Sequence, residues 1–135
     1  MLHALEVIAT FCTTVFAGAA LYINVAEHPA RMALDTASAA KQWAPSYRRA
    51  TWMQAPLAVV GFVASIAAWF LGGGIAWLVA AVLIDAVVPF TFFGIMPTNI
   101  SCWRALLDKW ARLRAIRSAH GLVAALLCTS LLGRP

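Results

Sequence analysis

The sequence is short of charge, and that shortage defines the class of protein before any motif is considered. Only 11% of its 135 residues are Asp, Glu, Lys or Arg, and 63% are hydrophobic. An ordinary soluble domain has about 25% charged residues, so this chain has too little polar surface to cover a soluble globule. We therefore predict an integral membrane protein with a single domain over residues 1–135, because its spans can bury polar groups only against one another.

Several chemical signatures are also missing. The chain has no phosphate-binding loop, nucleophile elbow or dinucleotide-binding pattern, and no HxxxH or paired ExxH spacing of metal ligands. Its three cysteines form no CxxC pair, so we expect buried free thiols, with a disulfide between Cys12 and Cys128 as the alternative. No Lys or Arg precedes the first apolar run, so we expect no cleavable signal peptide. These absences predict a protein without a metal and without a cofactor.

Long apolar runs dominate what is present. Four of them, 4–25, 52–71, 75–95 and 112–132, approach the roughly 20 residues that a helix needs to cross a bilayer. Membrane spans are helices or closed barrels, and these runs are too long for barrel strands. The predicted fold is all-α, a four-helix transmembrane bundle with a tight turn at 72–74 between the second and third spans.

The segments between the spans are polar. In the connector 29–50, Asp35 can cap a short helix, and Pro45 should end it. The last helix should be long, over 100–132, so that it extends from the membrane into the cytoplasm. Nine of the ten Lys and Arg lie in the first and third connectors or the adjoining helix ends. The positive-inside rule places these connectors in the cytoplasm and both termini outside.

The predicted partners follow from the same pattern. We expect membrane lipids, in the inner membrane of a bacterium. We do not expect nucleic acid, although the net charge is +5, because the cations flank hydrophobic spans. Strips of small residues around Gly18 and Gly61 predict close helix packing, inside the bundle or in a homo-oligomer.

Polar side chains gather where the first span ends. Asn24, Glu27 and His28 share one helical face at i, i+3 and i+4. Pro29 should end or bend the span, and Arg31 lies one turn past Glu27 if the helix continues. One interpretation is a ligand or proton-transfer site, because histidine titrates near neutral pH. The other is a polar helix end that faces lipid headgroups.

The last helix carries a basic stripe. Trp110, Arg114, Arg117 and Gly121 follow one another at i, i+4, i+7 and i+11. If this stripe faces inward, we expect Arg117 to pair with Glu27, with Arg114 as a competitor. The alternative is that both arginines anchor lipid phosphates.

Two further features are open to two interpretations each. Asp85 is the one acid deep inside a predicted span. It is either a functional residue, with His120 as the partner to test, or a protonated group bonded to a neighbouring Ser or Thr. A set of aromatic residues either lines a pocket for a flat hydrophobic ligand or packs the core. These are Trp43, Tyr47, Phe90, Phe92, Phe93 and Trp103.

Three blocks of the sequence carry a family resemblance. The first runs from Gly18 to Asn24 and into Glu27-His28-Pro29-Ala30-Arg31, the second is Pro89-Phe90-Thr91 followed by Pro97-Thr98-Asn99, and the third is Trp110 followed by Arg117. Together they resemble the anthrone-oxygenase-like family of small four-span membrane proteins, which is largely catalogued as a domain of unknown function. The resemblance covers nearly the whole chain.

The resemblance implies, for a few members, cofactor-free oxidation of an anthrone to an anthraquinone. A base would remove the acidic ring C–H proton, and the carbanion would react with oxygen directly. In this chain His28 would be the base and Glu27 its orienter. Arg31 or Arg117 would stabilise the enolate oxygen. We further expect substrate contacts at Tyr22, Asn24, Tyr47, Asn99, Trp110 and Arg114.

The chain departs from the family at one position. Members commonly have a histidine between the tryptophan and the arginine of the third block, where this chain has Arg114. Two hypotheses remain: an oxygenase for a lipophilic aromatic or quinone-like molecule at the cytoplasmic mouth of the bundle, or a non-catalytic protein that binds lipid or a small molecule or serves as a structural subunit. A closed apolar cavity on which His28, Asn99 and Arg117 converge would favour the oxygenase.

Overall fold

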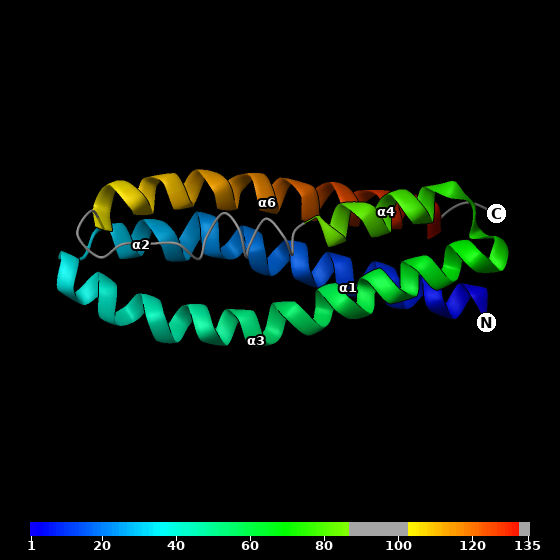
Figure 1. Ribbon diagram of the computed structural model, residues 1–135, viewed down its shortest axis with the longest axis horizontal. Coiled ribbons are helices and arrows are strands. Elements are labelled where there is room, and N and C mark those ends of the chain that lie inside the picture. Colours follow the sequence, from blue (N-terminus) through cyan, green and yellow to red (C-terminus); the bar gives the residue numbers. More distant parts are fainter. Residues whose placement is uncertain (87–102, 133–135) are drawn as a thin grey trace.

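Helices make up nearly all of the described chain. The structure is a computed structural model that describes residues 1–86 and 103–132, with side chains described for 1–86 and 112–132. In chain order the elements are α1 (Leu2–Tyr22), the π-helical η1 (Ile23–Glu27), α2 (His28–Met32), α3 (Thr36–Ala68), η2 (Trp69–Gly73), α4 (Ile75–Asp85) and α6 (Trp103–Leu132). Figure 1 shows them side by side along one long axis.

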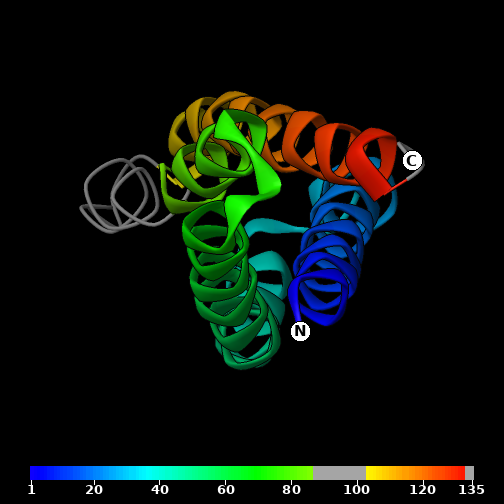
Figure 2. The same cartoon turned by 90° about the vertical axis from the view of Figure 1, so that its right-hand side faces the viewer.

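The helices form a bundle in which α1 packs against α3 and α6, and α4 packs against α3 and α6. Viewed end on, α4 lies between α3 and α6, across the bundle from α1 (Figure 2). The start of α1 and the end of α6 lie at the same end of the bundle, where η2 turns the chain from α3 into α4 (Figure 1). Gly72 and Gly74 make that turn with φ of 90° and 91°, a backbone region that favours glycine.

Within the described residues, three helical segments are long and apolar enough to cross a membrane, Leu2–Met32, Thr36–Gly73 and Arg112–Leu132. They correspond to the first, second and fourth predicted spans, so the prediction of an all-helical membrane protein is confirmed. The third predicted span, 75–95, begins as the shorter apolar helix α4, and its second half lies outside the described residues.

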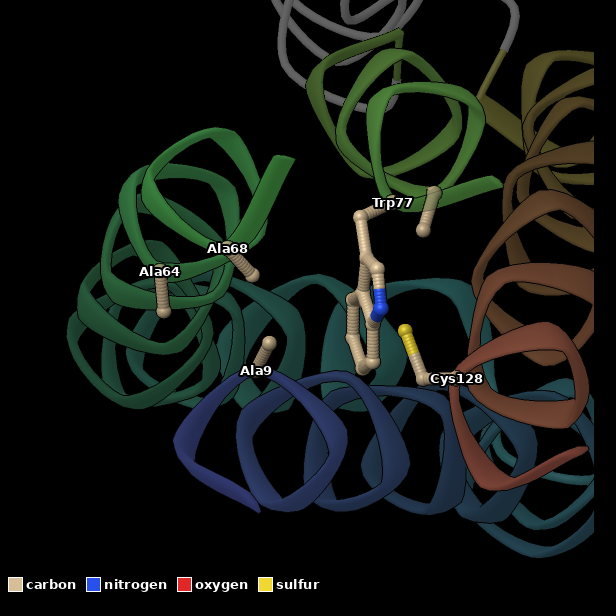
Figure 3. Close-up of a cluster of buried hydrophobic side chains, with 6 residues drawn as sticks. Ala9, Ala64, Ala68, Trp77 and Cys128 are labelled. Atoms are coloured by element: carbon tan, nitrogen blue, oxygen red, sulfur yellow. The ribbon is translucent and has the colours of Figure 1, made fainter. Parts of the chain in front are cut away.

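The core is built mainly from small side chains. One cluster consists of Ala9, Ala64, Ala68, Trp77, Ala80 and Cys128. Trp77 extends from α4 toward α1 and Cys128 of α6, so one large indole fills the space between helices that are lined with alanine (Figure 3). Cys128 and Cys12 are both buried free thiols, as expected from the sequence. Gly61 lies against Cys12 in this packing, whereas nothing lies within 4 Å of a Cβ built on Gly18.

The predicted break at Pro45 is wrong. Instead of a short connector helix followed by the second span, α3 runs without interruption from Thr36 to Ala68, through Pro45 and Pro56. Asp35 caps its start as predicted, accepting hydrogen bonds from two backbone amides at 3.0 Å. Both prolines lie on the exposed side of the helix, where the carbonyls that they leave without a donor can meet water or headgroups. Long helices tolerate proline under such conditions.

Candidate functional site

The end of the first span is reshaped by a wide helical turn. The helix does not end at Pro29. The segment Ile23–Glu27 adopts a π-helical turn, and α2 then begins with Pro29 in its first turn, where a missing N–H costs least. A π-turn holds one more residue than an α-turn and is frequent at functional sites. The helix therefore continues past Pro29, and Arg31 follows Glu27 by one turn.

Glu27 is the centre of a hydrogen-bonded cluster that joins three elements. Its Oε1 accepts from Arg31 Nη2 at 2.5 Å and from the hydroxyl of Ser46 on α3. Arg31 Nη2 also lies 3.5 Å from Ser46 Oγ. The Arg31 side chain is 2% exposed and that of Glu27 is 19% exposed, so this ion pair is shielded from water. It ties η1 and α2 to the first half of α3.

Asn24 connects the same turn to the last helix. Its Nδ2 donates to Ser118 Oγ at 2.6 Å and to the backbone carbonyl of Arg114 at 3.3 Å. The stripe of α6 faces inward, because Arg114, Arg117 and Gly121 are buried. Trp110, at its start, lies outside the residues with described side chains.

Arg117 does not pair with Glu27 as the sequence led us to expect. Its Nη2 donates to Gln54 Oε1 of α3, and its guanidinium lies 5.2 Å from the centre of the Phe16 ring of α1. The exposed fractions of Arg117 and Gln54 are 6% and 3%. Glu27 is bound to Arg31 instead, because the continued helix brings Arg31 to position i+4. Arg114, the predicted competitor, is buried beside them and interacts electrostatically with Arg117, Glu27 and Arg31.

A groove of about 570 Å³ runs beside this cluster, between the end of α1 with η1 and the first half of α3. Its walls are mainly apolar, and its polar groups include the Glu27 carboxylate, the Ser46 hydroxyl and the side chain of Arg49. Tyr22, a predicted substrate contact, is among its lining residues. The site thus combines a mainly apolar groove with a partly buried carboxylate at its edge, and this carboxylate is bound to a buried guanidinium.

Other predicted site residues lie elsewhere. His28 is half-buried and does not line this groove, and Tyr47 stacks on Trp43 with ring centres 5.3 Å apart. Asn99 lies outside the described residues. Asp85 and His120 are both exposed, and His120 Nδ1 is 2.8 Å from the carbonyl oxygen of its own helix at Ile116. Their burial and contacts give no support to a pair between them.

Four residues of the site were missed in the sequence: Phe16, Ser46, Gln54 and Ser118. Gln54 and Ser118 carried a usable signal, because each is a polar residue inside a predicted apolar span, and such groups face inward to find partners. Ser46 directly follows Pro45, so the predicted helix break at Pro45 concealed its position on the continuous helix α3. Phe16 had no signal that distinguishes it from other apolar residues of the first span.

The chain is similar to a known enzyme over nearly its whole length. It is 31% identical to anthrone oxygenase tpcL of Aspergillus fumigatus, in an alignment that covers 90% of this chain and 92% of that protein. No family model and no solved structure matches the sequence. The coverage includes the polar turn of η1 and α2 and the basic stripe of α6, where the resemblance was first noted. The chain belongs to the anthrone oxygenase family.

Proposed function

We propose that this protein is a membrane-embedded oxygenase that oxidises a lipophilic aromatic molecule with an acidic ring C–H, such as an anthrone-like compound, without a cofactor. The observation that supports it is the position of Glu27. This carboxylate is held by Arg31 and Ser46 at the edge of an apolar groove, in a chain related to an anthrone oxygenase. An aromatic body fits such a groove, and a charged pair beside it can act on an acidic C–H group.

The reaction requires a base, an enolate stabiliser and oxygen. The base takes a proton from a ring CH₂, and the carbanion is delocalised as an enolate. The carbanion and O₂ form a peroxide anion, which takes up a proton and loses water to leave a carbonyl. One O₂ thus supplies the new carbonyl oxygen and the oxygen of one water molecule, and the carbon is oxidised without an added electron donor.

His28 is the proposed base, with Glu27 as its orienting partner. Glu27 is a second candidate for the same step, because it lines the groove itself and its neighbours Arg31 and Ser46 fix its position. Arg31 or Arg117 is the proposed donor to the enolate oxygen, since buried guanidinium groups stabilise developing negative charge strongly. Tyr22, Asn24, Tyr47, Asn99, Trp110 and Arg114 stay as proposed substrate contacts.

The proposed topology is a four-span bundle whose third span continues from α4 into the residues beyond Asp85. The start of α1 and the end of α6 lie at the same end of the bundle, which agrees with an even number of spans (Figure 1). We propose that the basic connectors are cytoplasmic and that the termini lie outside. The inner membrane of a bacterium stays our proposal for the location, although the relative named above is fungal.

A non-catalytic role as a lipid-binding or small-molecule-binding subunit is the second candidate. It is favoured by the face of α1 around Gly18, which is open within the described chain and could pack against a second copy. The test is oxygen consumption and anthraquinone formation by the detergent-purified protein with anthrone as the probe, relative to the spontaneous rate. Acceleration that is lost in His28→Ala or Glu27→Gln, and retained in the exposed-site control Arg112→Gln, supports the oxygenase. No acceleration by the folded protein contradicts it.

A further inference from the structure

We propose that the buried polar layer behind the groove, which contains Arg31, Gln54, Arg114 and Arg117, is a binding site for an anionic oxygen group. This group would be the carboxylate or phosphate of an amphiphilic ligand. Arg117 and Gln54 would hold this group, and the apolar body of the ligand would lie in the groove. The inference deepens the proposed function and rests on its groove, because it assigns part of the binding affinity to a charged group on the substrate or on a bound lipid.

This layer has more buried hydrogen-bond donors than acceptors to receive them. Among the described residues, the buried side-chain atoms there without a hydrogen-bond partner include Nε and Nη1 of Arg31, Nε of Arg117 and Nε2 of Gln54. All four are donors. Buried donors without acceptors are costly, and native proteins leave few of them. The group that is missing from this layer is therefore an acceptor with several lone pairs.

The layer also carries a net positive charge. Arg31, Arg114 and Arg117 are 2%, 4% and 6% exposed, and a guanidinium stays protonated in a protein. Glu27 is the acid bound among them. The other acids with described side chains are placed elsewhere: Glu6 beside His3, Asp35 at the cap of α3, and Asp85 exposed at the end of α4. A net positive charge in a region shielded from water favours an anionic ligand and disfavours a metal cation.

The groove gives the proposed ligand a route to these donors. Glu27 and Ser46 line the groove, and both contact Arg31 Nη2, so the guanidinium lies directly behind this wall. Met53 lines the groove one residue before Gln54, and Gln54 in turn binds Arg117. A ligand with an apolar body in the groove can therefore direct its anionic group toward the pair formed by Gln54 and Arg117.

Gln54 has a specific part in this site. Its Oε1 accepts from Arg117, which leaves its amide Nε2 without a partner among the described residues. The amide therefore orients the guanidinium and adds one neutral donor to the charged ones. We infer that Gln54 is a positioning residue, so its loss should weaken binding of an anion more than binding of a neutral analogue of the same shape.

The test compares two ligands that differ in charge. Anthracene-2-carboxylate and the neutral anthracene-2-carboxamide are titrated into the full-length protein in neutral detergent, with binding followed by ligand fluorescence and by the shift in melting temperature. The expected preference for the carboxylate is roughly tenfold to a hundredfold, the effect of charge-assisted hydrogen bonds. Equal binding of the two ligands, or no binding of either, overturns the proposal.

Two variants and one matched control locate the site. Gln54→Leu and Arg117→Gln should remove most of the preference for the carboxylate, while Arg112→Gln, an exposed arginine on the same helix, should keep it. An unchanged preference in both site variants overturns the proposal. If the variants fail to fold, the comparison of carboxylate with carboxamide on the unmodified protein still decides, because at equal ligand concentration the more tightly bound ligand raises the melting temperature more.

Titrations with two further ligands identify the source of the anion. Binding of phosphatidate in place of the aromatic carboxylate, lost in the same variants, supports the anion site and identifies its occupant as a lipid headgroup. Inorganic phosphate tests whether the charged group suffices without an apolar body. Oxygen consumption with anthrone is measured in parallel. Anion binding without turnover contradicts only the oxygenase proposal, and turnover without anion preference contradicts only the anion site.

Discussion

Arg31 donates to Glu27 across one helical turn, at 2.5 Å, with its guanidinium almost fully buried. The contact exists because the helix continues past Pro29 through a π-turn. It carries two consequences. The carboxylate at the groove is fixed in one position, and the last helix must satisfy its buried arginines with other partners, as Arg117 does with Gln54.

Glu27→Gln should destabilise the protein strongly. The substitution leaves Arg31 as a buried charge without its counter-ion, and breaking a buried pair in this way typically costs about 3–5 kcal/mol. Thermal melting in detergent measures the effect. Glu6→Gln is the matched control, because Glu6 pairs with a histidine that is 80% exposed, and such pairs contribute little. Equal melting temperatures for the two variants would mean that the pair is not shielded from water.

The spans and the polar turn could be predicted from the sequence, and the partners within the turn could not. Apolar length alone located the first, second and fourth spans, because a bilayer imposes one thickness on every helix. The spacing of Asn24, Glu27 and Arg31 identified the polar turn for a similar reason: side chains one turn apart must share a face. Both predictions depended only on the length of a helix and the spacing of residues along it.

Choosing Arg117 as the partner of Glu27 failed because it required distances between helices. The sequence places both residues at a similar membrane level, but the continued helix brings Arg31 within reach of Glu27 first. The prediction also overlooked Gln54, whose inward direction depends on the unbroken path of α3 through Pro45. Spacing along one helix can be derived from sequence, but contacts between helices depend on their rotation and depth.

His28→Ala should abolish turnover of anthrone and leave the fold intact. A positioned general base contributes at least about 100-fold to the rate, and His28 is only half-buried, so its loss leaves no large cavity. The rate of anthraquinone formation and the melting temperature are measured together. His120→Ala, at an exposed position on α6, serves as the control. Full activity in His28→Ala would transfer the role of base to Glu27.

Arg117→Leu should destabilise the bundle, and a second substitution should restore much of the loss. The single variant leaves Gln54 buried without its partner, at a cost of about 1–3 kcal/mol. In the double variant with Gln54→Leu, both polar groups are replaced by apolar ones, which is often close to neutral in a buried layer. Melting of the unmodified protein, the two single variants and the double variant forms a complete cycle, with Arg112→Leu as the exposed-site control. Purely additive losses would argue against direct coupling between Arg117 and Gln54.

The start of α3 should lose order in acid. The Ser38 side chain and the Ser38 and Ala37 amides hydrogen-bond Asp35, which lowers the pKa of its carboxyl below the ordinary value. Because the pKa is lowered in the folded state, the charged cap stabilises the helix fully above the ordinary pKa, and its contribution disappears as the pH falls through the lowered one. NMR shifts of the Ala37 and Ser38 amides report the transition. Asp35→Asn keeps a capping oxygen without a charge, so its amide shifts should not titrate.

Gly61 and Gly18 should respond in opposite ways to the same substitution. A Cβ at Gly61 would lie 3.3 Å from Cys12 Cβ and 3.6 Å from Thr13 Cγ2, so Gly61→Val must push α3 away from α1. Overpacking of this kind costs about 1–3 kcal/mol. A Cβ at Gly18 meets nothing within 4 Å, so Gly18→Val should leave the melting temperature of the monomer unchanged.

The Gly18 variant also tests whether a second copy of the chain packs on α1. If it does, Gly18→Val should lower the dimer fraction in native mass spectrometry without lowering the stability of the monomer, because the added methyl groups keep the two helices apart. Gly61→Val should lower monomer stability first, and any loss of dimer should only follow from it. A Gly18→Val monomer that melts as early as Gly61→Val would mean that the face of α1 around Gly18 is covered within the chain itself.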